Sequence, residues 1–143
     1  MKIQIKVCGM TDEKQVLSLK ELGVNYVGFI FYPKSPRAVD ARQPIESPLG
    51  LQRVGVFVDE PLESVLVLQK RWRLDILQLH GEETTDYLAA LQQKGMRIVK
   101  AISIKEESDF NQCVAYQKYC DHFLVDTQGP AKGRNGFVFD WSL

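Results

Sequence analysis

The sequence predicts an α/β fold made of repeated strand–helix units, and three observations support this. Short apolar runs recur with starts about 20–30 residues apart, the length of one βα unit. The runs are mostly unbroken, as in Val54–Val58, which is typical of strands covered on both faces. Segments of helical periodicity lie between the runs. The predicted strands are Ile3–Val7, Tyr26–Phe31, Val54–Val58, Ile76–Leu79, Ile98–Ala101 and Phe123–Val125.

Helix start and stop signals occur in the links between these strands. Thr11 is the expected N-cap of the first helix, because acidic residues follow it where the helix dipole is positive, and Gly23 ends that helix. Pro61 suits the first turn of the helix after the third strand. Two further helices are predicted over Glu82–Lys94 and Glu106–Tyr119.

The link Ala41–Gln52 departs from this rhythm. It contains Pro44, Pro48 and Gly50 where the second helix would lie. Proline removes a main-chain donor and clashes with the preceding turn. We therefore expect a short helix or none in this link.

Alternating βα units leave two architectures, an open doubly wound sheet or a closed (βα)8 barrel. No G-x-G-x-x-G follows the first strand, and reactive side chains follow the ends of many strands, which favours the barrel. A complete eight-unit barrel needs about 200 residues or more. The 143 residues supply about six units. We therefore expect one domain over residues 1–143, an incomplete (βα)8 barrel without its last two strands.

Composition excludes several functional classes. Lys plus Arg equals Asp plus Glu at 18 each, so no basic field is expected to bind nucleic acid or a membrane surface. No apolar run is long enough to cross a bilayer. Cys113 and Cys120 are seven residues apart on a predicted helix, roughly 10 Å along its axis, which is too far for a disulfide. Reduced thiols and no secretory signal predict a cytoplasmic protein.

Two residues are candidates for proton transfer. Cys8 ends the first strand and precedes a helix start, where backbone dipoles favour a thiolate that can act as a base. Asp126 follows the sixth strand, where partial desolvation favours the protonated carboxyl of a general acid. A buried packing cysteine and a loop-bracing aspartate are the alternative interpretations.

Four further residues are candidates for substrate binding. Arg37 ends a proline-stiffened loop and could hold a carboxylate or phosphate. His80 ends the fourth strand and could donate to a substrate oxygen, although a structural histidine is an equal alternative. Gly133 and Gly136 would let main chain approach a ligand closely. His122 precedes the sixth strand, on the opposite rim, and receives no role.

Other chemistries find little support in the motifs. No C-x-x-C or H-x-x-x-H spacing indicates a metal site, and no G-x-S-x-G indicates a serine nucleophile. We expect neither a metal nor an organic cofactor. A base and an acid at one barrel mouth suit an isomerisation by proton transfer.

Seven motifs, taken together and in order, resemble the phosphoribosylanthranilate isomerase family, a (βα)8 enzyme family of tryptophan biosynthesis. The matching stretches are Lys6–Thr11, Gly28–Arg37, Gly55–Val58, Gln78–Gly81, Val99–Ala101, Val125–Thr127 and Phe139–Trp141. The resemblance implies an Amadori rearrangement of N-(5'-phosphoribosyl)anthranilate, an aldose–ketose isomerisation of a phosphosugar.

The resemblance also implies roles for the candidates. Asp126 would be the general acid that protonates the ribose ring oxygen, and Cys8 the base that removes the C2' proton. Arg37 would hold the anthranilate carboxylate, and His80 would line the site.

Two departures from the family pattern leave alternatives open. Arg134 adds bulk and charge between Gly133 and Gly136, where the family usually has small residues. The chain ends at Leu143, before the seventh and eighth strands, whose loops normally bind the substrate phosphate. We therefore expect weak substrate binding by this chain alone, and a homodimer or a completing chain at the open strand edges. An inactive fragment is the alternative, and a Schiff-base aldolase using Lys100 is a further one.

Overall fold

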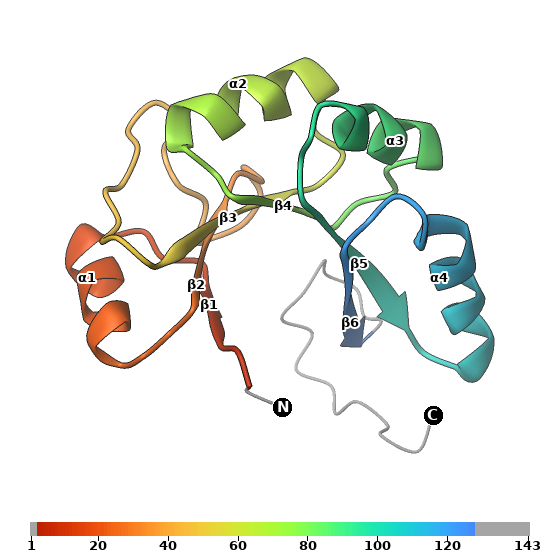
Figure 1. The fold of residues 1–143 in the computed structure, drawn as a ribbon, viewed down its shortest axis with the longest axis horizontal. Helices are drawn as coiled ribbons and strands as arrows, with labels where there is room; N and C mark the ends of the chain where they lie inside the picture. The colour runs from red at the N-terminus through yellow and green to blue at the C-terminus, as the bar shows by residue number, and fades with distance from the viewer. Residues whose placement is uncertain (1–2, 128–143) are drawn as a thin grey trace.

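The computed structural model describes residues 3–127 as one parallel sheet with helices along its convex side (Figure 1). The six strands follow chain order, β1-β2-β3-β4-β5-β6, and every neighbouring pair is parallel. The elements are β1 (Lys6–Cys8), α1 (Glu13–Glu21), β2 (Tyr26–Ile30), β3 (Gln52–Phe57), α2 (Leu62–Trp72), β4 (Ile76–Leu79), α3 (Thr85–Gln93), β5 (Ile98–Ile104), the 3₁₀ helix η1 (Glu107–Phe110), α4 (Asn111–Tyr116) and β6 (His122–Thr127).

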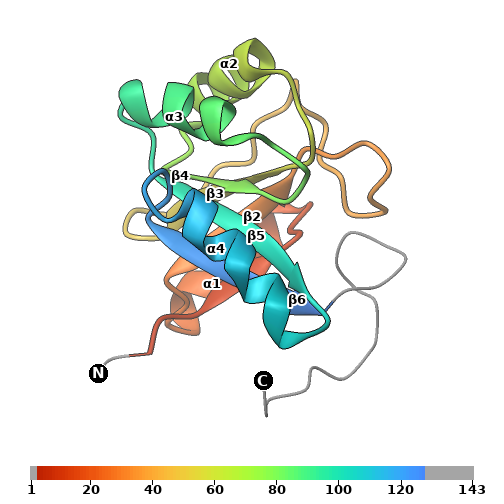
Figure 2. The same cartoon turned by 90° about the vertical axis from the view of Figure 1, so that its right-hand side faces the viewer.

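The predicted fold class is confirmed, since the six strands form part of a (βα)8 barrel. The sheet curves so that β1 and β6 lie at the two ends of an arc, and α4 lies against β5 (Figures 1 and 2). The carboxyl ends of all six strands therefore lie along one edge of the sheet.

The strand boundaries differ from the prediction at both ends of the sheet. Pairing of β1 with β2 begins at Lys6, while Ile3 and Ile5 are 78% and 49% exposed among the described residues. The predicted strand Ile3–Val7 was therefore placed too early. β5 and β6 run further than predicted, because their main-chain pairing continues to Ile104 and Thr127.

Three helix boundaries also differ. Asp12, not Thr11, caps α1, since its Oδ1 accepts hydrogen bonds from the amides of Lys14 at 2.8 Å and Gln15 at 3.3 Å. The helix predicted from Glu82 begins only at Thr85, after the Thr84 cap. The helix predicted over Glu106–Tyr119 is divided into η1 and α4.

Two other predictions are confirmed. Gly23 follows α1 with φ of 72°, a left-handed conformation that suits glycine. The link Ala41–Gln52 contains no helix. One side chain from α2 and one from β3 hold it, since the Trp72 indole donates to the Ala41 carbonyl at 3.0 Å and Arg53 donates to the Ile45 carbonyl at 2.8 Å.

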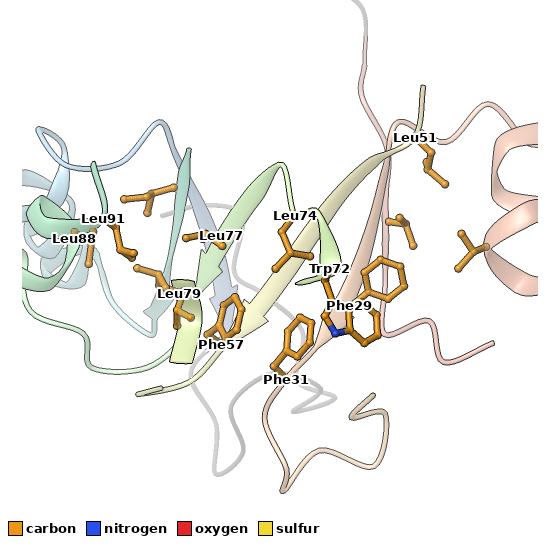
Figure 3. Close-up of a cluster of buried hydrophobic side chains, with 14 of the residues drawn as sticks. Phe29, Phe31, Leu51, Phe57, Trp72, Leu74, Leu77, Leu79, Leu88 and Leu91 are labelled. Carbon is orange, nitrogen blue, oxygen red and sulfur yellow. The ribbon is translucent and has the colours of Figure 1, made fainter. Parts of the chain in front are cut away.

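The hydrophobic core lies between the sheet and the helices (Figure 3). Trp72 is fully buried, and its ring lies 5.1 Å from that of Phe29 and 5.0 Å from that of Phe31. Phe31 stacks on Phe57 at 5.0 Å. Aromatic burial of this size dominates core energetics. It fixes β2 and β3, and with them the loops at their carboxyl ends, against α2.

No helix within residues 3–127 is long and apolar enough to cross a membrane.

Candidate active site

The candidate site lies at the carboxyl edge of the sheet, where βα folds place their chemistry. Cys8 is the last residue of β1, and Asp126 is the penultimate residue of β6, so they occupy the same edge on the two outermost strands. His80 directly follows β4. Arg37 lies in the loop after β2. The structure joins these four residues in two contacting pairs.

The first pair is Arg37 and Cys8. Arg37 Nη1 donates a hydrogen bond of 2.8 Å to the Cys8 main-chain carbonyl. Its Nε is buried and has no hydrogen-bond partner among the described residues. A buried guanidinium N–H without an acceptor is costly.

Two glycines make this arrangement possible. Gly9 has φ of 84°, and a Cβ there would lie 2.6 Å from Arg37 Nη1. A Cβ on Gly28 would lie 2.6 Å from Cys8 Sγ. The Cys8 thiol and the Arg37 guanidinium therefore each occupy space that a side chain would otherwise fill. The Gly9 amide donates to the Gly28 carbonyl at 2.8 Å, which fixes the turn.

The loop that carries Arg37 is held to the sheet. The Val39 amide donates to the Ile30 carbonyl at 2.9 Å, and Ala38 forms a parallel bridge with Ile30. The Arg37 amide donates to Ser35 Oγ at 3.3 Å. These bonds fix the main chain on both sides of Arg37.

The second pair is His80 and Asp126. His80 Nε2 lies 3.4 Å from Asp126 Oδ2, and the side chains are 13% and 25% exposed. The His80 amide donates to the Phe57 carbonyl at 2.8 Å, which ties the end of β4 to β3. Partial exposure leaves the carboxyl accessible to a ligand. The imidazole is thus a neighbour of the predicted general acid, a contact that sequence reasoning did not predict.

Sequence reasoning also missed a buried ionic cluster behind His80. Lys100 Nζ lies 3.0 Å from Glu83 Oε2, and both side chains are almost completely buried. Lys100 also donates to the carbonyls of Leu79 and Gly81. All three N–H groups of the ammonium can thus be accounted for, which argues against a Schiff-base role. A lysine within the apolar run of β5 was the signal that a buried partner exists.

Two tyrosines enclose this cluster. The Tyr116 hydroxyl donates to the Glu83 carbonyl at 3.0 Å, and the Tyr87 hydroxyl donates to the Glu60 carbonyl at 2.8 Å. Burial, with added repulsion from Glu82 and Glu83, raises the pKa of Tyr116. Burial, followed by the carboxylates of Glu83 and other neighbours, raises the pKa of Tyr87. Both hydroxyls therefore stay protonated donors at neutral pH.

The remaining residues considered in the sequence are His122, Gly133 and Gly136. His122 is the first residue of β6, at the opposite end of the strand from the Asp126 edge, as expected. Gly133 and Gly136 lie outside the described residues. Within residues 3–127, no group of three or more His, Cys, Asp or Glu side chains could hold a metal ion.

Comparison with known proteins gives one consistent result. Residues 5–143 match the family described as PRAI, N-(5'phosphoribosyl)anthranilate (PRA) isomerase. An N-(5'-phosphoribosyl)anthranilate isomerase of Phocaeicola vulgatus is 37% identical over 97% of this chain and 67% of its own length. That of Thermotoga neapolitana is 39% identical over 99% of this chain and 69% of its own length.

Solved structures agree. The crystal structure of the phosphoribosyl anthranilate isomerase from Thermotoga maritima superposes with a TM-score of 0.88 at 35% identity, over 99% of this chain and 70% of that one. A complex of such an isomerase with reduced 1-(o-carboxyphenylamino)-1-deoxyribulose 5-phosphate has a TM-score of 0.81 at 34% identity, over 89% of this chain and 66% of that one. The chain spans about two thirds of the length of the relatives it matches.

Proposed function

Because this chain belongs to the N-(5'-phosphoribosyl)anthranilate isomerase family, we propose that it converts N-(5'-phosphoribosyl)anthranilate into 1-(2-carboxyphenylamino)-1-deoxyribulose 5-phosphate by acid–base catalysis. The observation that carries the proposal is the family match over residues 5–143. The location of Cys8 and Asp126 at the same edge of the sheet supports it.

Asp126 is the proposed general acid. Its carboxyl gives a proton to the ribose ring oxygen while the C1'–oxygen bond breaks. The lone pair of the anthranilate nitrogen forms the C1'=N bond of a Schiff base. The 25% exposure of the Asp126 side chain supports this role, because the carboxyl can reach a ligand. The neighbouring His80 limits the directions in which the carboxyl can turn.

Cys8 is the proposed general base. As a thiolate it removes the proton from C2', which the iminium group makes acidic. The C2'–hydrogen electrons form a C1'=C2' bond, and the C1'=N electrons return to nitrogen. The resulting enaminol becomes the amino ketone by gaining a proton at C1' and losing the hydroxyl proton at C2'. No atoms are gained or lost overall, and each catalysed proton transfer contributes about 10²–10⁴-fold to the rate.

Arg37 is the proposed ligand of the anthranilate carboxylate. Its side chain is partly buried at the carboxyl edge of the sheet, and a guanidinium suits a planar carboxylate. The hydrogen bond to Cys8 places this anion site next to the proposed base. The aromatic end and the reacting carbons of one small substrate would therefore contact neighbouring parts of the chain.

Assembly and location are also proposals. A structure described as generated monomers of the dimeric isomerase from Thermotoga maritima has a TM-score of 0.80 over 90% of this chain. We infer that this chain pairs with a second copy or a completing chain, because β1 and β6 are edge strands within residues 3–127. The cysteines Cys8, Cys113 and Cys120 are free thiols, which supports a cytoplasmic location.

The proposal is tested by incubating the purified chain with N-(5'-phosphoribosyl)anthranilate and separating the product by chromatography. Cys8→Ser and Asp126→Asn should each lower kcat by about 10²–10⁴-fold. Cys113→Ser in α4 is the matched thiol control and should retain activity. Full activity in both site variants would contradict the mechanism. A folded wild-type chain that binds substrate without turnover would support the inactive-fragment alternative, which the isomerase relatives do not favour.

A further inference from the structure

The buried pair Glu83 and Lys100 holds the main chain on both sides of His80. Lys100 Nζ lies 3.0 Å from Glu83 Oε2, and the two side chains are 2% and 3% exposed. The same Nζ donates to the Gly81 carbonyl at 2.7 Å and to the Leu79 carbonyl at 3.4 Å. These two carbonyls belong to the residues that flank His80. The ammonium therefore bridges the peptide units around the imidazole.

The Glu83 carboxylate binds main-chain amides of the same loop and of the loop after β3. Glu83 Oε1 accepts hydrogen bonds from the amides of Asp59 and Gly81, each at 3.1 Å. The Tyr116 hydroxyl donates to the Glu83 carbonyl at 3.0 Å, and Lys100 Nζ lies 5.5 Å from the Tyr116 ring centre. Both the amide and the carbonyl of Gly81 are thus fixed by the ion pair.

Gly81 packs closely against the loop after β3. A Cβ on Gly81 would overlap with Asp59 Oδ1, so the loops after β3 and β4 are in direct contact. Asp59 Oδ1 accepts a hydrogen bond from the Glu82 amide at 2.6 Å. The main chain of residues 79–83 is thus held on both sides of His80.

We propose that the Glu83–Lys100 pair is a positioning device that holds the His80 imidazole against the carboxyl of Asp126. His80 Nε2 lies 3.4 Å from Asp126 Oδ2, so a small loop movement would separate them. An imidazole at Oδ2 leaves the other carboxylate oxygen for a ligand. The catalytic consequence rests on the proposed role of Asp126 as the acid, whereas the positioning itself does not.

The energetics of buried charge support a positional role. Taking two charges out of water costs more than an apolar pair of similar size, so such a pair adds little net stability. Its value lies in the directed bonds, here to two carbonyls and two amides around one histidine. A 1 Å displacement of a catalytic group can cost about 10²-fold in rate.

The test measures the electrostatic coupling of His80 to Asp126 by NMR titration of the imidazoles, which needs no enzymatic activity. In the otherwise unchanged chain, Asp126→Asn should lower the pKa of His80, because a carboxylate 3.4 Å away stabilises the imidazolium. The charged groups around the loop, Asp59, Glu82, Glu83 and Lys100, remain in both proteins. His122, at the other end of β6, is the internal reference and should not respond.

The same titration is then repeated with Lys100→Met. We expect the effect of Asp126→Asn on His80 to fall by more than half, because the imidazole no longer stays beside the carboxyl. Lys94→Met, which removes an exposed lysine at the C-cap of α3, is the matched control and should leave the coupling intact. An unchanged coupling in folded Lys100→Met protein would overturn the proposal.

Lys100→Met leaves Glu83 buried without its partner and can therefore impair folding. If it does, Glu83→Gln is combined with Lys100→Met. That double variant has no unpaired buried charge and undergoes the same titration, with the same two outcomes. If the chain is active, loss of the Glu83–Lys100 pair should lower kcat by about 10–100-fold with little change in KM. Wild-type protein that shows the coupling but no turnover would contradict the proposed function and support the positioning.

Discussion

Arg37 and Cys8, 29 residues apart in the chain, are joined by a hydrogen bond of 2.8 Å from the guanidinium to the main-chain carbonyl. The bond places a fixed positive charge next to the turn that presents the thiol. It also links a candidate anion site to a candidate base through one peptide unit. Substitutions at this contact therefore test binding and chemistry separately.

Gly9→Ala should destabilise the fold and move the Arg37 guanidinium. At a φ of 84° alanine must adopt the left-handed conformation, which costs about 1–2 kcal/mol of folding free energy. Its Cβ would also lie 2.6 Å from Arg37 Nη1. Gly23→Ala, at φ of 72° with open space around it, is the matched control, because it has the conformational cost but no contact with a side chain. Urea denaturation measures both free energies of unfolding. Equal losses would show that the guanidinium moves aside freely.

Arg37→Met should weaken substrate binding more than it slows chemistry. Hydrogen bonds to a charged group are worth about 1.5–3 kcal/mol, which corresponds to an increase of about 10–100-fold in KM. Arg42→Met removes a guanidinium whose side chain is 87% exposed and should leave KM unchanged. Steady-state kinetics of the two variants provide the comparison. A similar KM in both would remove Arg37 from the binding site.

Trp72→Phe should lower stability by about 1–3 kcal/mol. The indole donates to the Ala41 carbonyl at 3.0 Å, and phenylalanine cannot replace that donor. The smaller ring also leaves space beside Phe29 and Phe31. Thermal and urea unfolding followed by circular dichroism measure the loss. A change below about 0.5 kcal/mol would mean that water or the loop itself satisfies the carbonyl.

Asp109→Asn should destabilise the protein at neutral pH and have no effect in strong acid. Hydrogen bonds from the amides of Lys105 and Glu106 lower the pKa of Asp109 from its ordinary value of 3.8. A group with a lowered folded-state pKa contributes its full stability above the unfolded value, and loses it as the pH falls through the folded value. Unfolding at pH 7 and below pH 3 measures the difference. Glu107→Gln, from the same turn, controls for net charge.

Much of the fold followed from the apolar runs. The prediction matched β4 at both ends and β2 within one residue, because apart from Gln78 every position there is apolar or small. It stopped short on β5 and β6, where Ser103 and Asp126 continue the main-chain ladder. Side-chain hydropathy does not report such pairing. At β1 the alternation was misleading, since Ile3 and Ile5 are not covered within the described residues.

The candidate site was predictable as a set of positions but not as a set of contacts. The ends of predicted strands placed Cys8, His80 and Asp126 on one edge. Nothing in the spacing indicated that Arg37 would bind a main-chain carbonyl or that His80 would lie beside Asp126. These contacts depend on strand register and on sheet curvature, which only the folded chain defines.

The helix-free link between β2 and β3 is held by the main-chain carbonyls of Ala41 and Ile45, in addition to the apolar side chains that it packs on the core. Every residue type has a main-chain carbonyl. The hydrogen bonds from Trp72 and Arg53 therefore do not depend on which side chains the link carries. The exposed positions of the link, such as Leu49, can therefore accept substitutions or an inserted tag while its path along the sheet is kept.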